Sequence, residues 1–339
     1  MISVRAATPA DRERWDAYVL AHPESHFGQR WGWVELTERS HGVTRRAWLA
    51  EDTGAVVGVL PLFEKRGGTP ALFSAPGGLL ARDAAVAEAL LTPAREVLVL
   101  GRHAWIELRD QQHAWPALET STEHVTMVLD LAVSPEAQWN AFDAKLRNQI
   151  RKGEKAQFAV TWGPEQIGAF HRVLLENMRD LGTPVRNAAY YRLALERLGG
   201  AGSLLVIAQN RVPAGCMFTV SHAAMFTDPW AASLRRYFAL CPNQVLYWSA
   251  LQRALALGHK RFDFGRSQWN SGTFRFKEQW GARPVQLHYQ YVLGTAKKIP
   301  TLADQKSGFD LAVRVWKRLP IALAGVLGEP AKRMFPEAL

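Results

Sequence analysis

The segment from Asn243 to Gly281 constrains the fold of this chain more than any other stretch. Apolar residues recur at helical spacing between Val245 and Leu255, which predicts a helix with one buried face. We expect Asn243 to cap the start of this helix and Gly258 to end it, because glycine reaches left-handed torsions without a Cβ clash. The alternating residues 261–265 then predict a short strand.

A polar loop, residues 266–273, leaves that strand and leads into residues 274–281. In a strand–helix–strand unit, such a loop emerges at the carboxyl end of the sheet, where ligands usually bind. We therefore expect the active site at this loop.

The same residues carry a resemblance to a known family. Residues 262–267 read Phe-Asp-Phe-Gly-Arg-Ser, and the pairs Gly272-Thr273, Phe276-Lys277 and Trp280-Gly281 follow. This order resembles the carboxyl-terminal signature of the FemAB-like acyltransferases, above all the subgroup that accompanies exosortase (PEP-CTERM) systems. Three further segments extend the resemblance over nearly the whole chain: residues 50–61, 179–184 and 316–320.

The resemblance implies an α/β (α+β) fold in which a GNAT-like (acyl-CoA N-acyltransferase) unit occurs twice, as two mixed sheets flanked by helices. Related enzymes add amino acids to peptidoglycan precursors. The implied reaction moves an aminoacyl or acyl group to an amine of a cell-envelope precursor or an exopolysaccharide-linked acceptor.

The sequence pattern also predicts a duplication, because two helical stretches followed by a hairpin occur twice. The hairpins are expected at residues 45–63 and 203–218. We expect four parts: a first half (1–133), a connecting basic helix (134–157), a second half with the active-site signature (158–294) and a basic amphipathic helical tail (295–339).

Composition is typical of a folded globular protein, with 48% hydrophobic and 21% charged residues among 339. No apolar run approaches the roughly 18 residues that a spanning helix needs, and charged residues occupy the N-terminus where a signal peptide is apolar. We therefore expect a cytoplasmic protein. Cys216 and Cys241 are too few for a disulfide framework and lack metal-ligand spacing.

The net charge of +10 favours polyanionic partners such as tRNA, phosphorylated carriers or anionic lipid. Arg147, Arg151 and Lys155 recur at four-residue steps, either as a solvated face or as a surface that grips phosphate. The tail residues 308–335 are either a membrane-interface element, peripheral at the inner membrane, or a helix packed on the enzyme with its charges in water.

Motifs for covalent, zinc, nucleotide-hydrolysing and dinucleotide chemistry are absent from the sequence. Acyl transfer by direct attack remains, in which the protein supplies positioning, a proton acceptor and donors to the oxyanion. We expect no metal and no tightly bound cofactor, and an acyl donor that is aminoacyl-tRNA or acyl-CoA.

GNAT folds bind the carrier phosphate at a helix N-terminus, which the resemblance places at residues 240–245. Arg235, Arg236 and Asn243 are the expected phosphate-binding residues. The glycine-rich loop of acetyl-CoA users (Q-x-x-G-x-G/A) is absent there, which favours aminoacyl-tRNA as the donor.

Lys277 aligns with a lysine that the family places near the transferred acyl group, and it would stabilise a carbonyl or phosphate oxygen. The alternative is a surface lysine beside Glu278. Asp263 would either accept the amine proton or pair with Arg266 and hold the loop.

The remaining expected site residues bind substrate: Ser267, Thr273, Arg179, Thr183, Arg147 and Arg151. Residues 179–186 resemble the family's acceptor-side segment and would close over substrate. Residues 228–233 replace the subgroup's usual glycines, and Gln268 replaces a usual lysine, so the acceptor is left open.

Two other functions stay open from the sequence. One is an acyl-CoA-dependent N-acyltransferase that acts on a small metabolite. The other is a non-catalytic GNAT scaffold that binds RNA or protein through residues 145–155.

Overall fold

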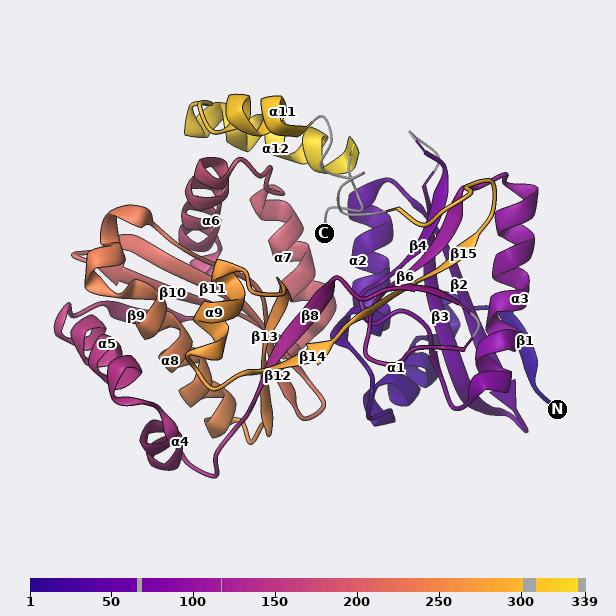
Figure 1. Cartoon of the computed structure of the whole chain (residues 1–339), viewed down its shortest axis with the longest axis horizontal. Coiled ribbons are helices and arrows are strands. Elements are labelled where there is room, and N and C mark those ends of the chain that lie inside the picture. The colour runs from indigo at the N-terminus through magenta and orange to yellow at the C-terminus, as the bar shows by residue number, and fades with distance from the viewer. Residues whose placement is uncertain (66–68, 117, 301–308, 335–339) are drawn as a thin grey trace. The chain divides into compact units, whose positions relative to one another are not determined.

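The computed structural model describes residues 1–65, 69–116, 118–300 and 309–334 (Figure 1). The chain forms two compact units. The first holds Met1–His124 and the described part of Gln286–Gln305; the second holds Val125–Val285 and the described part of Lys306–Phe335.

The first unit is a mixed sheet in the order β1-β2-β3-β4-β6-β15-β7, with β5 against β3. The step from β4 to β6 is parallel. The strands are β1 (Ser3–Ala6), β2 (Thr44–Asp52), β3 (Ala55–Lys65), β4 (Ala71–Ser74), β5 (Leu80–Ala81), β6 (Trp105–Gln111), β7 (Glu119–Ser121) and β15 (His288–Leu293). The helices are α1 (Arg12–Ala21), α2 (Trp31–His41) and α3 (Ala84–Leu100).

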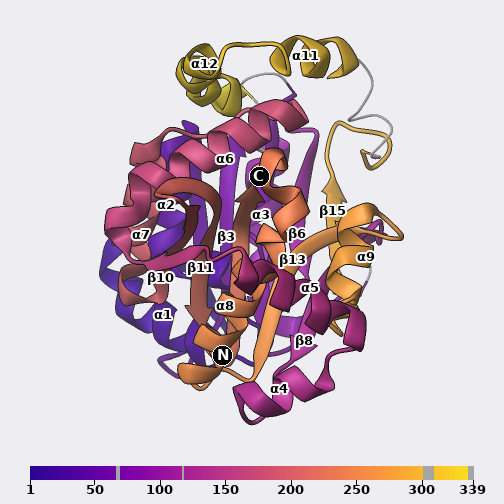
Figure 2. The same cartoon turned by 90° about the vertical axis from the view of Figure 1, so that its left-hand side faces the viewer.

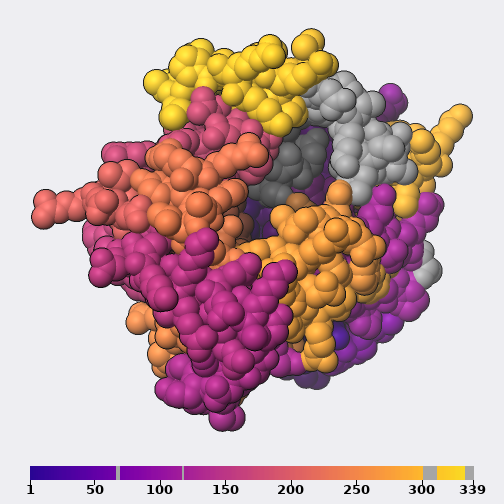
Figure 3. Space-filling view, turned by 60° about the vertical axis from the view of Figure 1, so that its left-hand side comes forward, coloured from indigo at the N-terminus to yellow at the C-terminus, as the bar shows by residue number. Residues whose placement is uncertain are grey.

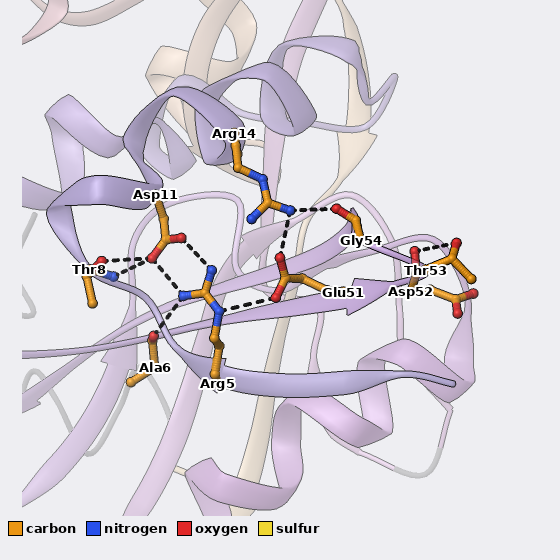
Figure 4. Close-up of polar contacts among 9 residues, drawn as sticks. All are labelled: Arg5, Ala6, Thr8, Asp11, Arg14, Glu51, Asp52, Thr53 and Gly54. Carbon is orange, nitrogen blue, oxygen red and sulfur yellow. Dashed lines mark hydrogen bonds and ion pairs between the residues drawn. The ribbon is translucent and has the colours of Figure 1, made fainter.

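An arginine ties the first strand of this unit to its neighbours (Figure 4). The guanidinium of Arg5 donates to Asp11, just before α1, and to Glu51 of β2. The hydrogen bond from Arg5 holds the pKa of the Asp11 carboxyl well below its usual range. Asp11 also accepts from the Thr8 backbone N–H at 2.8 Å, which fixes the turn that starts α1.

The second unit is a mixed sheet in the order β14-β8-β13-β12-β11-β10-β9 (Figure 1), and Figure 2 labels the helices α4 to α8 around it. Its strands are β8 (His124–Asp130), β9 (Ala159–Trp162), β10 (Gly202–Gln209), β11 (Val212–His222), β12 (Met225–Ser233), β13 (Arg261–Gln268) and β14 (Arg283–Gln286). Its helices are α4 (Pro135–Ala141), α5 (Ala144–Lys155), α6 (Ile167–Leu181), α7 (Ala188–Leu198), α8 (Pro242–Ala256), α9 (Gly272–Glu278), α11 (Phe309–Trp316) and α12 (Ile321–Met334).

The predicted fold class is confirmed: two mixed sheets are flanked by helices, and each contains one of the expected hairpins, β2–β3 and β10–β11. The hairpin turns are Thr53-Gly54 and Asn210-Arg211, and all four residues have positive φ. A two-residue turn in which both residues have positive φ matches the right-handed twist of the strands that it joins.

The boundaries between parts lie elsewhere than the sequence pattern predicted. β15 was expected in the second half, but it pairs with β6 and β7 in the first unit. Residues 134–157 belong to the second unit and form α4 and α5 instead of one helix. The break follows from Asp143, whose carboxylate caps α5 by accepting from the Leu146 N–H at 2.6 Å.

The cap expected at Asn243 is also wrong by two residues. Cys241 is the N-cap of α8, with φ of 55°, and Asn243 lies inside the helix. Gly258 does terminate this segment in the left-handed region, with φ of 79°.

Within the residues that the structure describes, no helix has both the length and the apolar character to cross a membrane.

The contact between α5 and the start of α8 is close enough to test by substitution. A Cβ at Gly153 would lie 2.5 Å from Val245 Cγ2 and 3.0 Å from the Cys241 carbonyl oxygen. We expect Gly153→Ala to lower the free energy of unfolding by roughly 1 kcal/mol or more, because the backbone oxygen cannot move aside. Gly168→Ala in α6, with open space around its Cβ, is the control and should be neutral or stabilising in denaturant titrations. Equal effects of the two would contradict the described packing.

Candidate active site

Two parallel strands of the second unit separate early, and polar side chains gather where they part. β12 and β13 pair over Met225–Thr227 and Arg261–Asp263. No further pairing between them occurs among the described residues, although both strands continue. Asp263 of β13 is the last paired residue, and Asp228 of β12 lies just beyond the pairing. The charges of Asp228, Asp263 and Lys277 of α9 act on one another.

Lys277 is buried, with 7% of its surface exposed, and is not the surface lysine of the alternative interpretation. Its ammonium donates to the carbonyl oxygens of Gly265 at 2.8 Å and Arg266 at 3.0 Å. Burial lowers the pKa of Lys277, and the carboxylates of Asp228 and Asp263 oppose that shift. An ammonium has three N–H donors. Two of them bind the β13 carbonyl oxygens of Gly265 and Arg266, and the third is left to donate to a substrate oxygen.

Asp228 is the functional candidate that the sequence reasoning missed. Its side chain is 5% exposed, and its Oδ1 has no hydrogen-bond partner among the described residues. Burial raises the pKa of Asp228 to about 7, although Lys277 and a hydrogen bond from the Tyr247 hydroxyl both act to lower it. A carboxyl group with a pKa near the working pH can take up and release a proton.

A bulge in β12 sets the position of Asp228. Val220 pairs with Thr227 and Phe218 with Trp230, so Asp228 and Pro229 together face Thr219. A charged residue followed by proline inside an apolar strand was the available signal, since proline in a strand marks an edge or a bulge. The sequence pattern showed the pair, but only as a departure from the family.

Asp263 supports the loop in this structure. Its Oδ1 accepts hydrogen bonds from the Thr126 hydroxyl and from the Gly265 N–H, the latter at 2.8 Å. Gly265 has φ of 75°, so the turn that these bonds hold is one that glycine adopts readily. Ser267, two residues on, is 4% exposed, and its Oγ has no partner within the described ranges.

Arg266 lies in a cluster of cations drawn from three elements. The positive charges of Arg186, after α6, and Arg266 act on Lys332 of α12. Burial, with those two charges, lowers the pKa of Lys332 to about 8. Arg186 is 3% exposed and pairs with Glu329 of α12 at 2.9 Å. From the sequence, Arg186 was included only as the end of the segment 179–186, and Lys332 was not assigned to the site.

Residues 179–186, expected to close over substrate, are in contact with the tail helices. Arg179 donates to the Leu319 carbonyl oxygen at 2.7 Å and pairs with Asp180 at 2.8 Å. Thr183 donates its backbone N–H to Met178 at 2.8 Å and so ends α6. Arg179 therefore holds the tail, and the structure shows no substrate-facing role for it or for Thr183.

The three expected phosphate-binding residues lie near the start of α8 but have different contacts. Arg235 is exposed, and Arg236 pairs with Glu176 of α6. The side-chain oxygen of Asn243 accepts from the Ser233 hydroxyl. No described side chain caps α8, so its first-turn N–H groups are not used by a cap.

The other expected binding residues are placed on the surface of the second unit. The guanidinium of Arg151 lies over the Trp139 ring at 5.3 Å, and Arg147 is half-buried on α5. Thr273 is exposed at the start of α9, where its hydroxyl lies 3.0 Å from that of Ser271. Within the described ranges, no hydrogen bond or ion pair joins these three residues to Asp228, Asp263 or Lys277.

Figure 3 shows the tail helices α11 and α12 in yellow above the segment that contains α6, which both helices contact. A separate cavity of about 250 Å³ lies near the carboxyl end of α8, beside Trp162, Arg253 and His259. None of the expected site residues lines that cavity. Among the described residues, no group of three or more His, Cys, Asp and Glu side chains is arranged to hold a metal ion.

Comparison with known proteins assigns a domain to the region just described. Residues 140–278 match the family described as Acetyltransferase (GNAT) domain. The matched range contains Asp228, Tyr247, Asp263 and Lys277. No curated protein sequence matches the chain.

Several solved structures share the fold at low sequence identity. The crystal structure of FemX matches with a TM-score of 0.72 and 15% identity, over 86% of this chain and 98% of its own. A tandem GNAT protein from the clavulanic acid biosynthesis pathway matches with a TM-score of 0.58 and 13% identity, over 88% and 100%. The C-terminal domain of a putative lysylphosphatidylglycerol synthetase from Agrobacterium fabrum matches with a TM-score of 0.58 and 11% identity, over 91% and 95%.

The matched domain and the duplicated sheet architecture together define the class: the chain is an acyltransferase with a tandem GNAT fold. The candidate active site lies in its second unit.

The raised pKa of Asp228 predicts a pH-dependent contribution to stability. In the folded protein the Asp228 carboxyl group keeps its proton up to about pH 7. In the unfolded chain its pKa has the ordinary value of 3.8, so the proton is released at lower pH. Stability from this group is therefore present at low pH and is lost as the pH rises through that interval. The native protein loses this stability between pH 4 and 8, whereas Asp228→Asn has no such proton to lose. The free energy of unfolding of the variant, measured by urea titration relative to the native protein, should therefore rise by a few kcal/mol over that range. The exposed Glu154→Gln is the control, and parallel curves for native and Asp228→Asn would contradict the assignment.

Proposed function

We propose that this acyltransferase transfers an aminoacyl or acyl group to an amine of a cell-envelope precursor or an exopolysaccharide-linked acceptor. The observation that carries the proposal is the buried Asp228 carboxyl group near Lys277, where β12 and β13 part. One of its oxygens has no hydrogen-bond partner in the described part of the chain. A proton acceptor and an ammonium donor at one point suit attack by an amine on an activated carbonyl.

In the proposed reaction the acceptor nitrogen attacks the carbonyl carbon of the donor ester or thioester. Asp228 takes the proton that the nitrogen loses, and the remaining N–H of Lys277 donates to the carbonyl oxygen as it becomes negative. The carbon–nitrogen bond forms and the bond to the leaving oxygen or sulfur breaks. Asp228 then returns its proton to the leaving group, so the site ends as it began.

Tyr247 and Asp263 would act by positioning. The Tyr247 hydroxyl donates to Asp228 and orients its carboxylate. Asp263 holds the turn at Gly265, whose carbonyl oxygen accepts from Lys277. The reactive pair is thereby fixed from β13 and α8 before substrate arrives.

The donor and the acceptor are argued from charge and from similarity. The exposed guanidinium of Arg266, with Lys332 nearby, suits a polyanion such as a tRNA end or a phosphate-bearing precursor. The family's usual acetyl-CoA loop is replaced at residues 235–242, and similar folds occur in FemX and in a putative lysylphosphatidylglycerol synthetase. Together these features favour aminoacyl-tRNA as donor and, with the exosortase-associated resemblance, an envelope acceptor.

Acyl-CoA is the second candidate donor, with a small metabolite as acceptor. The match of residues 140–278 to an acetyltransferase domain favours it. A stability screen separates the candidates, because a ligand at a hundred times its dissociation constant adds about 2.7 kcal/mol. We expect stabilisation by aminoacyl-tRNA and by lipid-linked or UDP-linked sugars; stabilisation by CoA thioesters alone would replace the proposal with this alternative.

A non-catalytic scaffold would behave differently in the same samples. It would bind RNA in a salt-sensitive way through residues 145–155 and transfer no acyl group to any amine. Mass spectrometry of candidate acceptors after incubation with each donor distinguishes this case.

Lys277 gives the sharpest test of the reaction itself. Lys277→Met keeps the length of the side chain and removes the charge, so it should lower turnover by roughly 10² or more, the scale for one lost oxyanion donor. Lys152→Met on the exposed face of α5 is the matched control and should keep full activity. Thermal unfolding of both variants checks folding, and unchanged turnover in folded Lys277→Met would falsify the assigned role.

A further inference from the structure

The two tail helices of the second unit have an inner face that is packed in place. Ala324 of α12 is fully buried, and a Cβ at Gly328 would lie 2.2 Å from the Val185 carbonyl oxygen. The Arg179 bond to Leu319 and the ion pair between Arg186 and Glu329 fasten both helices to α6 and the loop after it. The tail is therefore a fixed part of this unit.

The outer face of the same helices is apolar and exposed. Six of the 17 exposed large apolar side chains in the described part of the chain fall within residues 311–327. The most exposed are Val326 at 72% and Leu311 at 66%, and the others are Val315, Ile321, Leu323 and Leu327. Single exposed apolar residues are ordinary, but a concentration of them marks an interaction surface.

Basic side chains border this apolar face. Arg314, Lys317 and Arg318 are exposed, and residues 311–328 contain no acidic residue. A groove of about 320 Å³ runs along α11, lined by Leu311, Val315 and Leu319 together with Arg314 and Arg318. Guanidinium groups at the edge of an apolar strip match lipid phosphates above acyl chains.

We propose that the outer face of α11 and α12 docks the protein on an anionic lipid bilayer, with both helices lying in the plane of the interface. The rigid inner packing presents this face without a further folding step. A second copy of the chain is the rival occupant, but a two-fold contact through this face would join two surfaces that both carry Arg314 and Arg318, and residues 311–328 contain no acidic residue. Like charges oppose that contact, whereas anionic headgroups favour the lipid surface.

Flotation of the full-length protein with vesicles tests the inference. We expect binding to phosphatidylcholine vesicles that contain phosphatidylglycerol, and little binding to phosphatidylcholine alone. The pair Leu323→Glu and Val326→Glu should lower the bound fraction at least about fivefold, and so should the pair Arg314→Gln and Arg318→Gln.

Matched controls keep the experiment specific. Val99→Glu with Leu100→Glu changes a still more exposed apolar pair on α3, at 71% and 85%. Arg151→Gln with Lys152→Gln removes the same charge from α5. Both control pairs should bind like the native protein, and thermal unfolding confirms that every variant is folded. The inference is overturned if the native protein ignores anionic vesicles, if the controls lose binding equally, or if sedimentation shows a dimer that Val326→Glu dissociates without any lipid binding.

Discussion

The early separation of β12 and β13 is the constraint on which the candidate site depends. After Thr227 and Asp263 the two strands no longer pair through backbone hydrogen bonds. The Lys277 ammonium instead donates hydrogen bonds to the carbonyl oxygens of Gly265 and Arg266. Aromatic rings close the space behind: Tyr247 stacks on Phe264 at 5.2 Å and packs against Trp280 at 5.8 Å. Burial among these side chains raises the pKa of Asp228, because it disfavours the charged form of the carboxyl group.

The first unit also has a parallel strand pair, β4 with β6, but hydrogen bonding continues beyond the paired residues. β4 and β6 pair at Leu72–Phe73, and the Arg109 N–H then donates to the Ser74 hydroxyl at 2.8 Å. The buried Glu107 accepts from Arg109 at 2.9 Å and from the Tyr291 hydroxyl at 3.1 Å. Both of its carboxyl oxygens have donors, whereas Asp228 keeps one oxygen without a partner among the described residues. This contrast is the physical reason to place the chemistry in the second unit.

Local patterns in the sequence predicted the hairpins, the helix before Gly258 and the loop 266–273 that leads to Lys277, because each depends on nearby residues. The roles of Asp228 and Lys332 depend on burial against elements distant in sequence, which periodicity does not report. The same limit explains β15, which was included in the second half although its partners β6 and β7 are distant in sequence. Asp263 could be placed at the site from its position, but only its contacts with Thr126 and Gly265 show that it braces the turn.

The central claim is that Asp228 receives the proton of the attacking amine. The pH dependence of kcat/KM for acyl transfer tests it most directly, because that profile reports the ionisation of the free enzyme's base. The account predicts a rate that rises with pH through a midpoint near 7 in the native protein, matching the raised pKa of Asp228. In folded Asp228→Asn that rise should vanish and leave a rate lower by roughly 10² to 10⁴. An unchanged profile in the variant would contradict the account.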